Sequence, residues 1–229
     1  MKTWAVIPAA GDSKRMPGDL PKQYRLIAGE PVILHTLRLL QRHPDIHGFM
    51  IGLAPDDTCW SAVPQRIDKP LLTCEGGNSR VKTVLHCLDA LHHMGEDDAL
   101  VLVHDAVRPC LEAKDLDKVL AMGAMGDHGA VLAQPLNDPV KRCGESGGDI
   151  CESHQPEGLW LAQTPQVFKL GLLRAALRAA IEANEVLDPS SAMERSGYRP
   201  RLVVSSPSNF KITYESDLAL AARLVICDA

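Results

Sequence analysis

The sequence lacks an excess of positive charge, a long apolar run and any CxxC spacing of its cysteines. Its 24 lysines and arginines are outnumbered by 29 aspartates and glutamates, which gives a net charge of −5. Proteins that bind nucleic acid or membrane surfaces non-specifically carry the opposite balance, so neither partner is expected. No stretch approaches the roughly 18 apolar residues of a membrane span.

The sequence also lacks the features of an exported protein. Pro8, Gly11 and Asp12 interrupt the first apolar stretch, which is too short for the apolar region of a signal peptide. The seven cysteines are odd in number, and without an export signal they are expected to be reduced thiols in the cytoplasm. Three of them are expected to fill the core rather than to bind a metal or act as nucleophiles: Cys87, Cys110 and Cys227.

Short apolar runs recur along the 229 residues, with helical patterns between them. The runs are continuous rather than alternating, which is typical of strands covered on both faces. This order of strands and helices predicts one α/β domain over residues 1–229, with a three-layer, mainly parallel sheet. The predicted strands are 4–8, 47–53, 99–105, 129–135 and 201–205. The predicted helices are 33–40, 81–91, 170–184 and 215–226.

The polar segment 136–158 breaks this rhythm and carries two adjacent glycines, Gly147 and Gly148, near its middle. We interpret it as a long hairpin or arm that leaves the domain. A disordered loop is the alternative, because the flanks contain few residues that favour strands. A projecting polar arm is difficult to stabilise alone, so a homodimer is expected, with the arm serving dimerisation.

The segment AVIPAAGDSKRMPGDLPKQY, residues 5–24, turns from an apolar strand into an irregular basic loop. In parallel α/β sheets, ligands collect outside the carboxyl ends of the strands, where this loop lies. Arg15 offers a planar fork of donors and Lys22 a compact charge, and both suit phosphate oxygens. The loop matches neither the P-loop nor the NAD-binding fingerprint, and a solvated surface loop is the alternative. Four cations lie in or beside the loop: Lys14, Arg15, Lys22 and Arg25.

Small residues open the basic loop. Ala9, Ala10 and Gly11 carry little side chain, so their backbone N–H groups can approach a ligand closely and form an anion-binding nest. Pro21 fixes the backbone just before Lys22. We therefore interpret the loop as a phosphate-binding site.

Five sequence blocks in order narrow the interpretation: PAAGDSKRM…PKQY, GGNSRVKTV (76–84), VHDAVRP (103–109), LWLAQTPQVF (159–168) and NFKITYESDL (209–218). Together they resemble the 2-C-methyl-D-erythritol 4-phosphate cytidylyltransferases, and the resemblance covers nearly the whole chain. It implies a Rossmann-like fold of the nucleotidyltransferase type. It also implies a reaction of isoprenoid precursor synthesis, in which CTP is joined to a polyol phosphate, pyrophosphate is released and Mg²⁺ is the cofactor.

The resemblance assigns roles on the phosphate side of the site. Arg15 and Lys22 hold the triphosphate and stabilise the α-phosphate, where negative charge concentrates during the reaction. Asp105 lies near the metal and the acceptor; a carboxylate at a strand end suits Mg²⁺, and the alternative is a turn or helix-capping acid. Lys211 neutralises charge across the site and also faces the acceptor. Two further residues are assigned to the acceptor: Arg108, as companion of Asp105, and Thr164, for which a turn threonine is the alternative.

The block GGNSRVKTV resembles the segment that reads the base. Gly77 and Asn78 are expected to contact cytosine, while Arg80 supports the loop. Thr83 stands where the family usually has serine, so a hydroxyl is kept at this position. The alternative is that Thr83 has no contact with the base and serves only at the start of a helix. Backbone groups of Ala9 and Ala10 are expected at the same base.

Four positions depart from the family pattern: Ser13 replaces a glycine, Pro139 and Leu187 replace threonines, and Pro156 replaces an arginine. The last three belong, by resemblance, to acceptor recognition, so the donor half of the site is expected to be intact and the acceptor half altered. Lys141, Arg142 and His154 lie near enough in sequence to replace the missing charge. A cytidylyltransferase for another polyol phosphate, such as ribitol 5-phosphate, and a CTP-binding paralogue without turnover are therefore alternatives. The cations that are kept argue against the paralogue.

Overall fold

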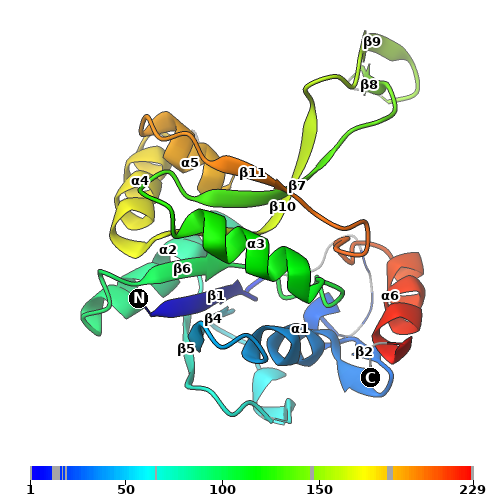
Figure 1. Ribbon diagram of the computed structural model, residues 1–229. Helices are drawn as coiled ribbons and strands as arrows, with labels where there is room; N and C mark the ends of the chain where they lie inside the picture. Colours follow the sequence, from blue (N-terminus) through cyan, green and yellow to red (C-terminus); the bar gives the residue numbers. More distant parts are fainter. Residues whose placement is uncertain are drawn as a thin grey trace.

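The computed structural model describes residues 2–11, 16, 18, 20–64, 66–144, 147–184 and 188–227. A seven-stranded sheet lies at its centre, in the order β11-β7-β10-β6-β1-β4-β5 (Figure 1). The strands of this sheet are β1 (Thr3–Pro8), β4 (Ile46–Leu53), β5 (Leu71–Glu75), β6 (Leu100–Val103), β7 (Ala130–Pro135), β10 (Trp160–Lys169) and β11 (Arg201–Val204). The helices are α1 (Val32–Gln41), α2 (Arg80–His93), α3 (Ala113–Gly123), α4 (Leu170–Glu182), α5 (Pro189–Arg195) and α6 (Glu215–Cys227). Shorter elements are η1 (Lys22–Tyr24), β2 (Leu26–Ile27), β3 (Glu30–Pro31) and η2 (Trp60–Ala62).

The sheet is mainly parallel, as predicted. Strand β10 alone runs antiparallel to its neighbours β6 and β7, whereas the other pairs of neighbours are parallel. Each predicted strand and helix is present in the structure. Four of the longer elements, namely β5, β10, α3 and α5, and the short elements η1, β2, β3 and η2 were not predicted. Strand β10 carries the polar run Gln163–Gln166 through its middle, which hides the apolar signal of a buried strand.

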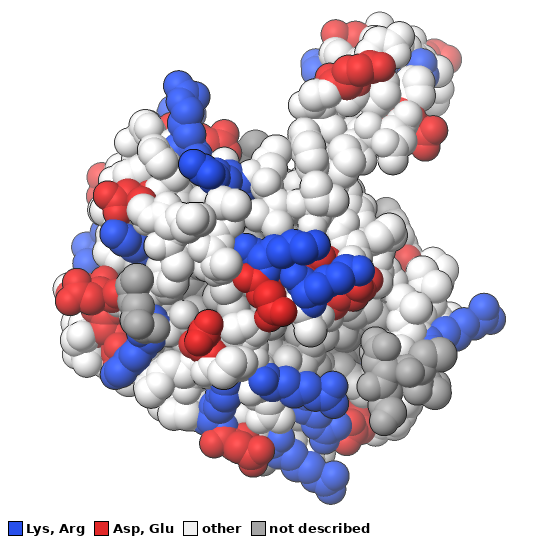
Figure 2. Space-filling model, viewed as in Figure 1, with Lys and Arg blue, Asp and Glu red and all other residues white. Residues whose placement is uncertain are grey.

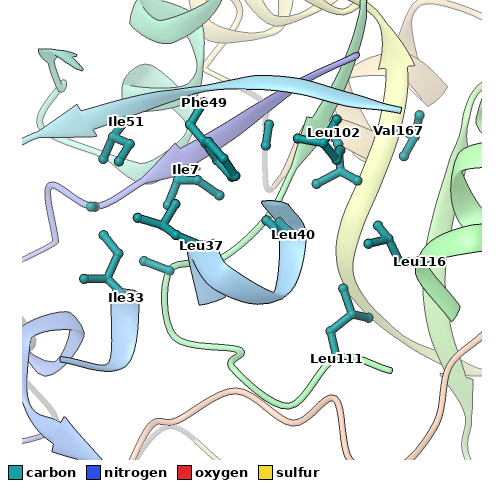
Figure 3. Packing of buried hydrophobic residues seen from close by; sticks show 14 of the residues in the cluster. Ile7, Ile33, Leu37, Leu40, Phe49, Ile51, Leu102, Leu111, Leu116 and Val167 are labelled. Carbon is teal, nitrogen blue, oxygen red and sulfur yellow. The ribbon is translucent and has the colours of Figure 1, made fainter. Parts of the chain in front are cut away.

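Helices cover both faces of the sheet and make the three layers. Helices α1 and α3 lie on one face, and α2 and α4 pack on the other. On the first face, Leu37 and Leu40 of α1 point toward the strand residues Ile7 and Phe49 (Figure 3). All four side chains are at most 1% exposed, and burial of each contributes about 1.5–3 kcal/mol to folding. The predicted core cysteines Cys87 and Cys110 are buried, while the side chain of Cys227 lies outside the described residues.

The described residues of the arm form a hairpin of β8 (Val140–Cys143) and β9 (Ile150–His154), which stands away from the body (Figure 1). The two strands pair antiparallel, with Lys141 opposite Ser153 and Arg142 opposite Glu152. A hairpin rather than a disordered loop therefore occupies this segment. On the face in Figure 2, cationic and anionic side chains are mixed, and the arm carries both signs. Within the described ranges, no helix is both long and apolar enough to cross a membrane.

Candidate active site

The parallel strands β1, β4, β5 and β6 end at one edge of the sheet, and a cavity of about 1250 Å³ opens there. This is the edge at which ligands of such sheets bind. The described walls come from residues 8–11, 20–23, 54–59, 75–80, 82–83 and 105–107, with 16, 18, 86 and 211. Ten of the predicted site residues line the cavity: Ala9, Ala10, Gly11, Lys22, Gly77, Asn78, Arg80, Thr83, Asp105 and Lys211. Arg15, Ser13 and Leu187 lie outside the described residues.

Asp105 lies just beyond the end of β6 and binds three cations. Its Oδ1 is 2.8 Å from Nε of Arg80, and its Oδ2 is 3.0 Å from Nζ of Lys211 and 3.4 Å from Nε of Arg108. Burial would raise the pKa of Asp105, but the charges of Arg80, Lys211 and Arg108 hold it well below its usual range. The carboxylate is therefore ionised throughout the physiological range and fixes the position of the cations around it.

Lys211 reaches Asp105 because its segment is hydrogen-bonded to the loop after β6. The backbone N–H of Ile212 donates to the carbonyl of Val107 at 3.0 Å. On the other side, Nζ of Lys22 lies 3.4 Å from the carbonyl oxygen of Ile212. Two lysines that are far apart in sequence, Lys22 and Lys211, thus meet at one end of the cavity.

Arg108 and Thr164 lie behind Asp105 and are not among the described residues of the cavity wall, and their roles toward the acceptor stay predictions. The Arg108 side chain is 9% exposed and donates from Nη1 to the carbonyl of Asn209 at 2.7 Å. The Thr164 hydroxyl is buried, accepts from the backbone N–H of Asp105 at 3.0 Å and lies 3.0 Å from Nδ1 of His104. Through these bonds the Thr164 hydroxyl positions the backbone of Asp105.

His104 completes this buried support. Its Nε2 lies 3.2 Å from the carbonyl oxygen of Arg108, so Nε2 carries the proton and Nδ1 accepts from the Thr164 hydroxyl. Burial lowers the pKa of His104 to about 4, which keeps the ring neutral at pH 7.

Acid is expected to destabilise the fold through His104. Between a folded pKa of about 4 and the ordinary 6.5, the unfolded chain binds more protons, so stability rises with pH in this window. The contribution of the neutral His104 to the free energy of unfolding is complete above pH 6.5. It falls by up to about 3 kcal/mol as the pH drops toward 4. Urea unfolding at several pH values should therefore show a shallower fall for His104→Asn, which keeps an acceptor for Thr164. Equal falls in the two proteins would contradict this assignment.

The wall formed by residues 76–79 is held to the first turns of α2 by one hydroxyl. Oγ1 of Thr83 accepts from the N–H of Gly77 at 3.1 Å and lies 3.0 Å from the carbonyl oxygen of Ser79. Ser79 caps α2, accepting from the N–H of Lys82. At Gly76, a Cβ would meet the Cβ of Ala10 at 2.6 Å, so glycine permits the contact between this wall and the opening loop. Thr83 is therefore a structural support of the loop predicted to read the base.

Two predicted contacts are changed by the structure. Arg80, expected to support the base-reading loop, directs its Nε to Asp105 instead, because it begins α2 where the helix faces the end of β6. The N–H of Ala9 donates to the carbonyl of Gly52 at 2.8 Å, so this amide is used within the fold and is not part of an anion nest. Arg25 lies 3.7 Å from Glu215 of α6 and is not among the described residues of the cavity wall.

Sequence reasoning missed several supporting residues. Asn209, fully buried, donates from Nδ2 to Oε1 of Gln163 at 2.8 Å and to the carbonyl of Thr164 at 2.9 Å, beside His104. Asp57, in the loop after β4, accepts from the hydroxyl of Tyr24 at 2.6 Å, and burial, followed by this bond, raises the pKa of Tyr24. An aspartate followed by small polar residues is a signal for a turn, but Asn209 gives no signal that separates it from an ordinary loop residue.

Comparison with known proteins places the chain in a family. The family model described as 2-C-methyl-D-erythritol 4-phosphate cytidylyltransferase matches residues 3–226. The chain belongs to this family. It is similar to the 2-C-methyl-D-erythritol 4-phosphate cytidylyltransferase of Xanthomonas oryzae pv. oryzae, with 43% identity over 99% of this chain and 85% of the relative. The Stenotrophomonas maltophilia relative of the same name is 44% identical over 94% of this chain and 93% of its own.

Solved structures of the family have the same fold. A crystal structure titled 4-diphosphocytidyl-2C-methyl-D-erythritol synthase has a TM-score of 0.85 at 32% identity and covers 98% of both chains. The Francisella tularensis family member has a TM-score of 0.83 at 28% identity, covering 98% of this chain and 100% of its own. These likenesses extend over nearly the whole chain.

Proposed function

We propose that this chain joins CTP to 2-C-methyl-D-erythritol 4-phosphate and releases pyrophosphate, a step in isoprenoid precursor synthesis outside the mevalonate route. The main support for the proposal is that Lys22, Lys211 and Asp105 line one cavity at the carboxyl edge of the sheet, in a chain of this family. A cavity of about 1250 Å³ has room for a nucleoside triphosphate and a small acceptor together.

The chemistry requires fixed positive charge at one phosphorus. A phosphate oxygen of the acceptor attacks the α-phosphorus of CTP, a new P–O bond forms there, and the bond to the departing pyrophosphate breaks. Negative charge grows on the α-phosphate oxygens and the leaving group. Lys22 and Lys211 lie at the end of the cavity where these groups are proposed to bind, and their positions are set before the reaction by η1 and by Asp105.

The opposite wall is proposed to select the pyrimidine. Gly77, Asn78 and Ala10 all border the cavity, and Ala10 packs against Gly76, the residue before Gly77. The close approach of Gly76 to Ala10 narrows this side of the cavity, so shape and backbone hydrogen bonds favour the smaller base.

Mg²⁺ is the proposed cofactor, with Asp105 as its protein ligand. Both oxygens of Asp105 are ion-paired, and within the described parts of the chain no three His, Cys, Asp or Glu side chains form a metal-binding group. Such a site fits an ion held mainly by substrate phosphates, with Asp105 giving one ligand, which is a common arrangement for Mg²⁺. When bound there, the ion would neutralise charge on the phosphates.

Assays of pyrophosphate release test the function. With CTP and Mg²⁺ present, 2-C-methyl-D-erythritol 4-phosphate should support turnover and ribitol 5-phosphate should not. Turnover with ribitol 5-phosphate alone would assign the chain to another polyol phosphate. Silence with every acceptor, combined with CTP binding, would indicate a nucleotide-binding protein without turnover.

The arm is proposed to supply charge for the acceptor in place of the arginine lost at Pro156. Its cations differ in their partners: Arg142 and His154 both lie within 3.3 Å of Glu152, whereas Nζ of Lys141 donates to the neutral hydroxyl of Ser153. Since an anionic partner cancels most of a cation's attraction for phosphate, Lys141 is the strongest candidate of the three.

A homodimer is also proposed, and we place the enzyme in the cytoplasm. Large apolar side chains are exposed on the arm, the start of β10 and the edge strand β11: Ile150, Leu159, Trp160, Leu161, Leu202 and Val204. Exposed apolar side chains of this kind are what a second copy of the chain would cover. Sedimentation at working concentration should give about twice the 24.9 kDa of one chain, and a mass near 24.9 kDa would contradict the dimer.

A further inference from the structure

Two cysteines lie in contact behind the wall of the nucleotide cavity. Cys74 is on β5 and Cys87 is on the second half of α2, and their Sγ atoms are 3.5 Å apart. Cys87 is fully buried, whereas Cys74 is partly exposed. Cys74 is therefore the more accessible residue of the pair.

A glycine on the neighbouring strand makes room for this contact. Gly52 of β4 is the direct pairing partner of Cys74. A Cβ on Gly52 would lie 3.0 Å from Sγ of Cys87 and 2.4 Å from Cγ2 of Thr83. The absence of a side chain at Gly52 lets α2 bring the sulfur of Cys87 down to the strand beside Cys74.

In the sequence, the two cysteines flank the residues that form one wall of the cavity. Residues 75–86 lie between the two cysteines, and they include the loop 76–79 and the first turns of α2. Thr83, which holds Gly77 through its hydroxyl, is one helical turn before Cys87 and on the same face of α2. The Cys74–Cys87 contact is therefore coupled, through β5 and α2, to the wall that Thr83 holds.

The two thiols differ in acidity. The hydrogen-bond contact with Cys87, acting against burial, lowers the pKa of Cys74. The same contact, together with burial, raises the pKa of Cys87. Cys74 is thus the thiol that ionises first, and it is also the more accessible one, as reaction with an oxidant requires.

We propose that Cys74 and Cys87 form a reversible oxidation site whose disulfide lowers the affinity of the cavity for CTP. The proposal deepens the proposed function, since it takes CTP as the ligand of this cavity. A disulfide requires the sulfurs to move from 3.5 Å to about 2.05 Å, which draws β5 toward α2 and shifts the residues between them.

Hydrogen peroxide is the oxidant class that fits a partly buried thiol. The Cys74 thiolate attacks one peroxide oxygen, an S–O bond forms, the O–O bond breaks and hydroxide leaves. The Cys87 sulfur then attacks the sulfur of the Cys74 sulfenic acid, the S–S bond forms, and water leaves with the proton of Cys87. In total two thiols are oxidised, one peroxide is reduced, and two waters are produced.

The test uses the full chain in a background that removes the other thiols that are at least partly exposed among the described cysteines, Cys59→Ser/Cys143→Ser/Cys151→Ser. Each protein is compared with itself before and after peroxide, so the background substitutions cancel. Mass spectrometry should find a link between Cys74 and Cys87, and dithiothreitol should reverse it. Equilibrium dialysis should give a Kd for CTP about tenfold higher in the oxidised form, since a shift of about 1 Å in a binding wall has effects of this size or larger.

A matched variant separates the disulfide from other damage. With Cys87→Ala in the same background, peroxide should leave Cys74 as a sulfenic acid that dimedone labels, and the Kd for CTP should change by less than twofold. A Cys74–Cys87 link that leaves the Kd unchanged, or the absence of any link, would overturn the proposal. Failure of the unsubstituted, reduced chain to bind CTP would instead count against the proposed function, and the presence of the link would still be measured independently.

Discussion

Replacing Lys22 with methionine is expected to lower kcat for CTP turnover by about 10²–10³-fold, with a much smaller change in KM. Methionine keeps most of the aliphatic length but removes the charge, so the effect reports electrostatics rather than a cavity. Lys22 lies at the end of the cavity where it approaches the carbonyl oxygen of Ile212, next to Lys211. Charge on the α-phosphate and leaving group grows during the reaction, so the lost interaction is stronger in the transition state than in the bound substrate. Steady-state kinetics of pyrophosphate release give both parameters.

Lys114→Met is the matched control for this experiment. Lys114 is exposed near the start of α3 and pairs with Glu112, and it is not among the described residues of the nucleotide cavity. The control should retain kcat within a factor of about two, because an exposed ion pair contributes little. A Lys22→Met protein with an unchanged kcat, or with a loss confined to KM, would show that Lys22 serves binding alone. Thermal unfolding of both variants should agree with the parent, since neither lysine is buried.

The nucleotide half of the site was predictable because its residues follow strand ends. Lys22 comes soon after β1, and Asp105 follows β6 by two positions. The carboxyl ends of parallel strands share one edge, so a correct strand prediction already brings these residues together. The family resemblance added which of them carry which role.

The residues that support Asp105 from behind were not predictable in the same way. Thr164 lies on the antiparallel strand β10, which the polar sequence hid, and its hydroxyl meets His104 and Asp105 only after the sheet has assembled. Arg108 has the sequence features of an exposed cation but is buried against the carbonyl of Asn209. Contacts between residues some 60 or 100 positions apart leave no local pattern, so the support that these residues give to Asp105 was not predicted.

The cysteine pair illustrates the same limit at shorter range. Cys74 and Cys87 are 13 positions apart, without the spacing of a redox or metal motif. Their contact depends on β5, which was not predicted, and on Gly52 of the adjacent strand. A correct prediction of α2 alone placed Cys87 in the core and could not place a second sulfur beside it.

Asp105→Asn is expected to cost about 3–5 kcal/mol of unfolding free energy, the largest stability effect expected at the site. The substitution keeps the shape of the side chain but removes the negative charge that Arg80, Lys211 and Arg108 share. Arg108 is the costly partner, because its side chain is 9% exposed and cannot regain water. For a chain of this length, such a loss lowers Tm by about 10 °C, which differential scanning calorimetry measures.

A second substitution tests whether unbalanced charge is the cause. In Asp105→Asn/Lys211→Met one cation is removed together with the anion. Only Arg80 and Arg108 then repel each other, so the total repulsion is smaller than among the three cations of Asp105→Asn. The double variant should therefore be more stable than the sum of the two single losses predicts, by about 1–2 kcal/mol, within the range of couplings between residues in contact. Simple additivity would contradict the charge explanation and would assign the loss to the geometry of the Asn amide. Because both partners of the Lys211–Asp105 contact of 3.0 Å are then absent, the comparison isolates that ion pair from the bonds that Thr164 and His104 provide.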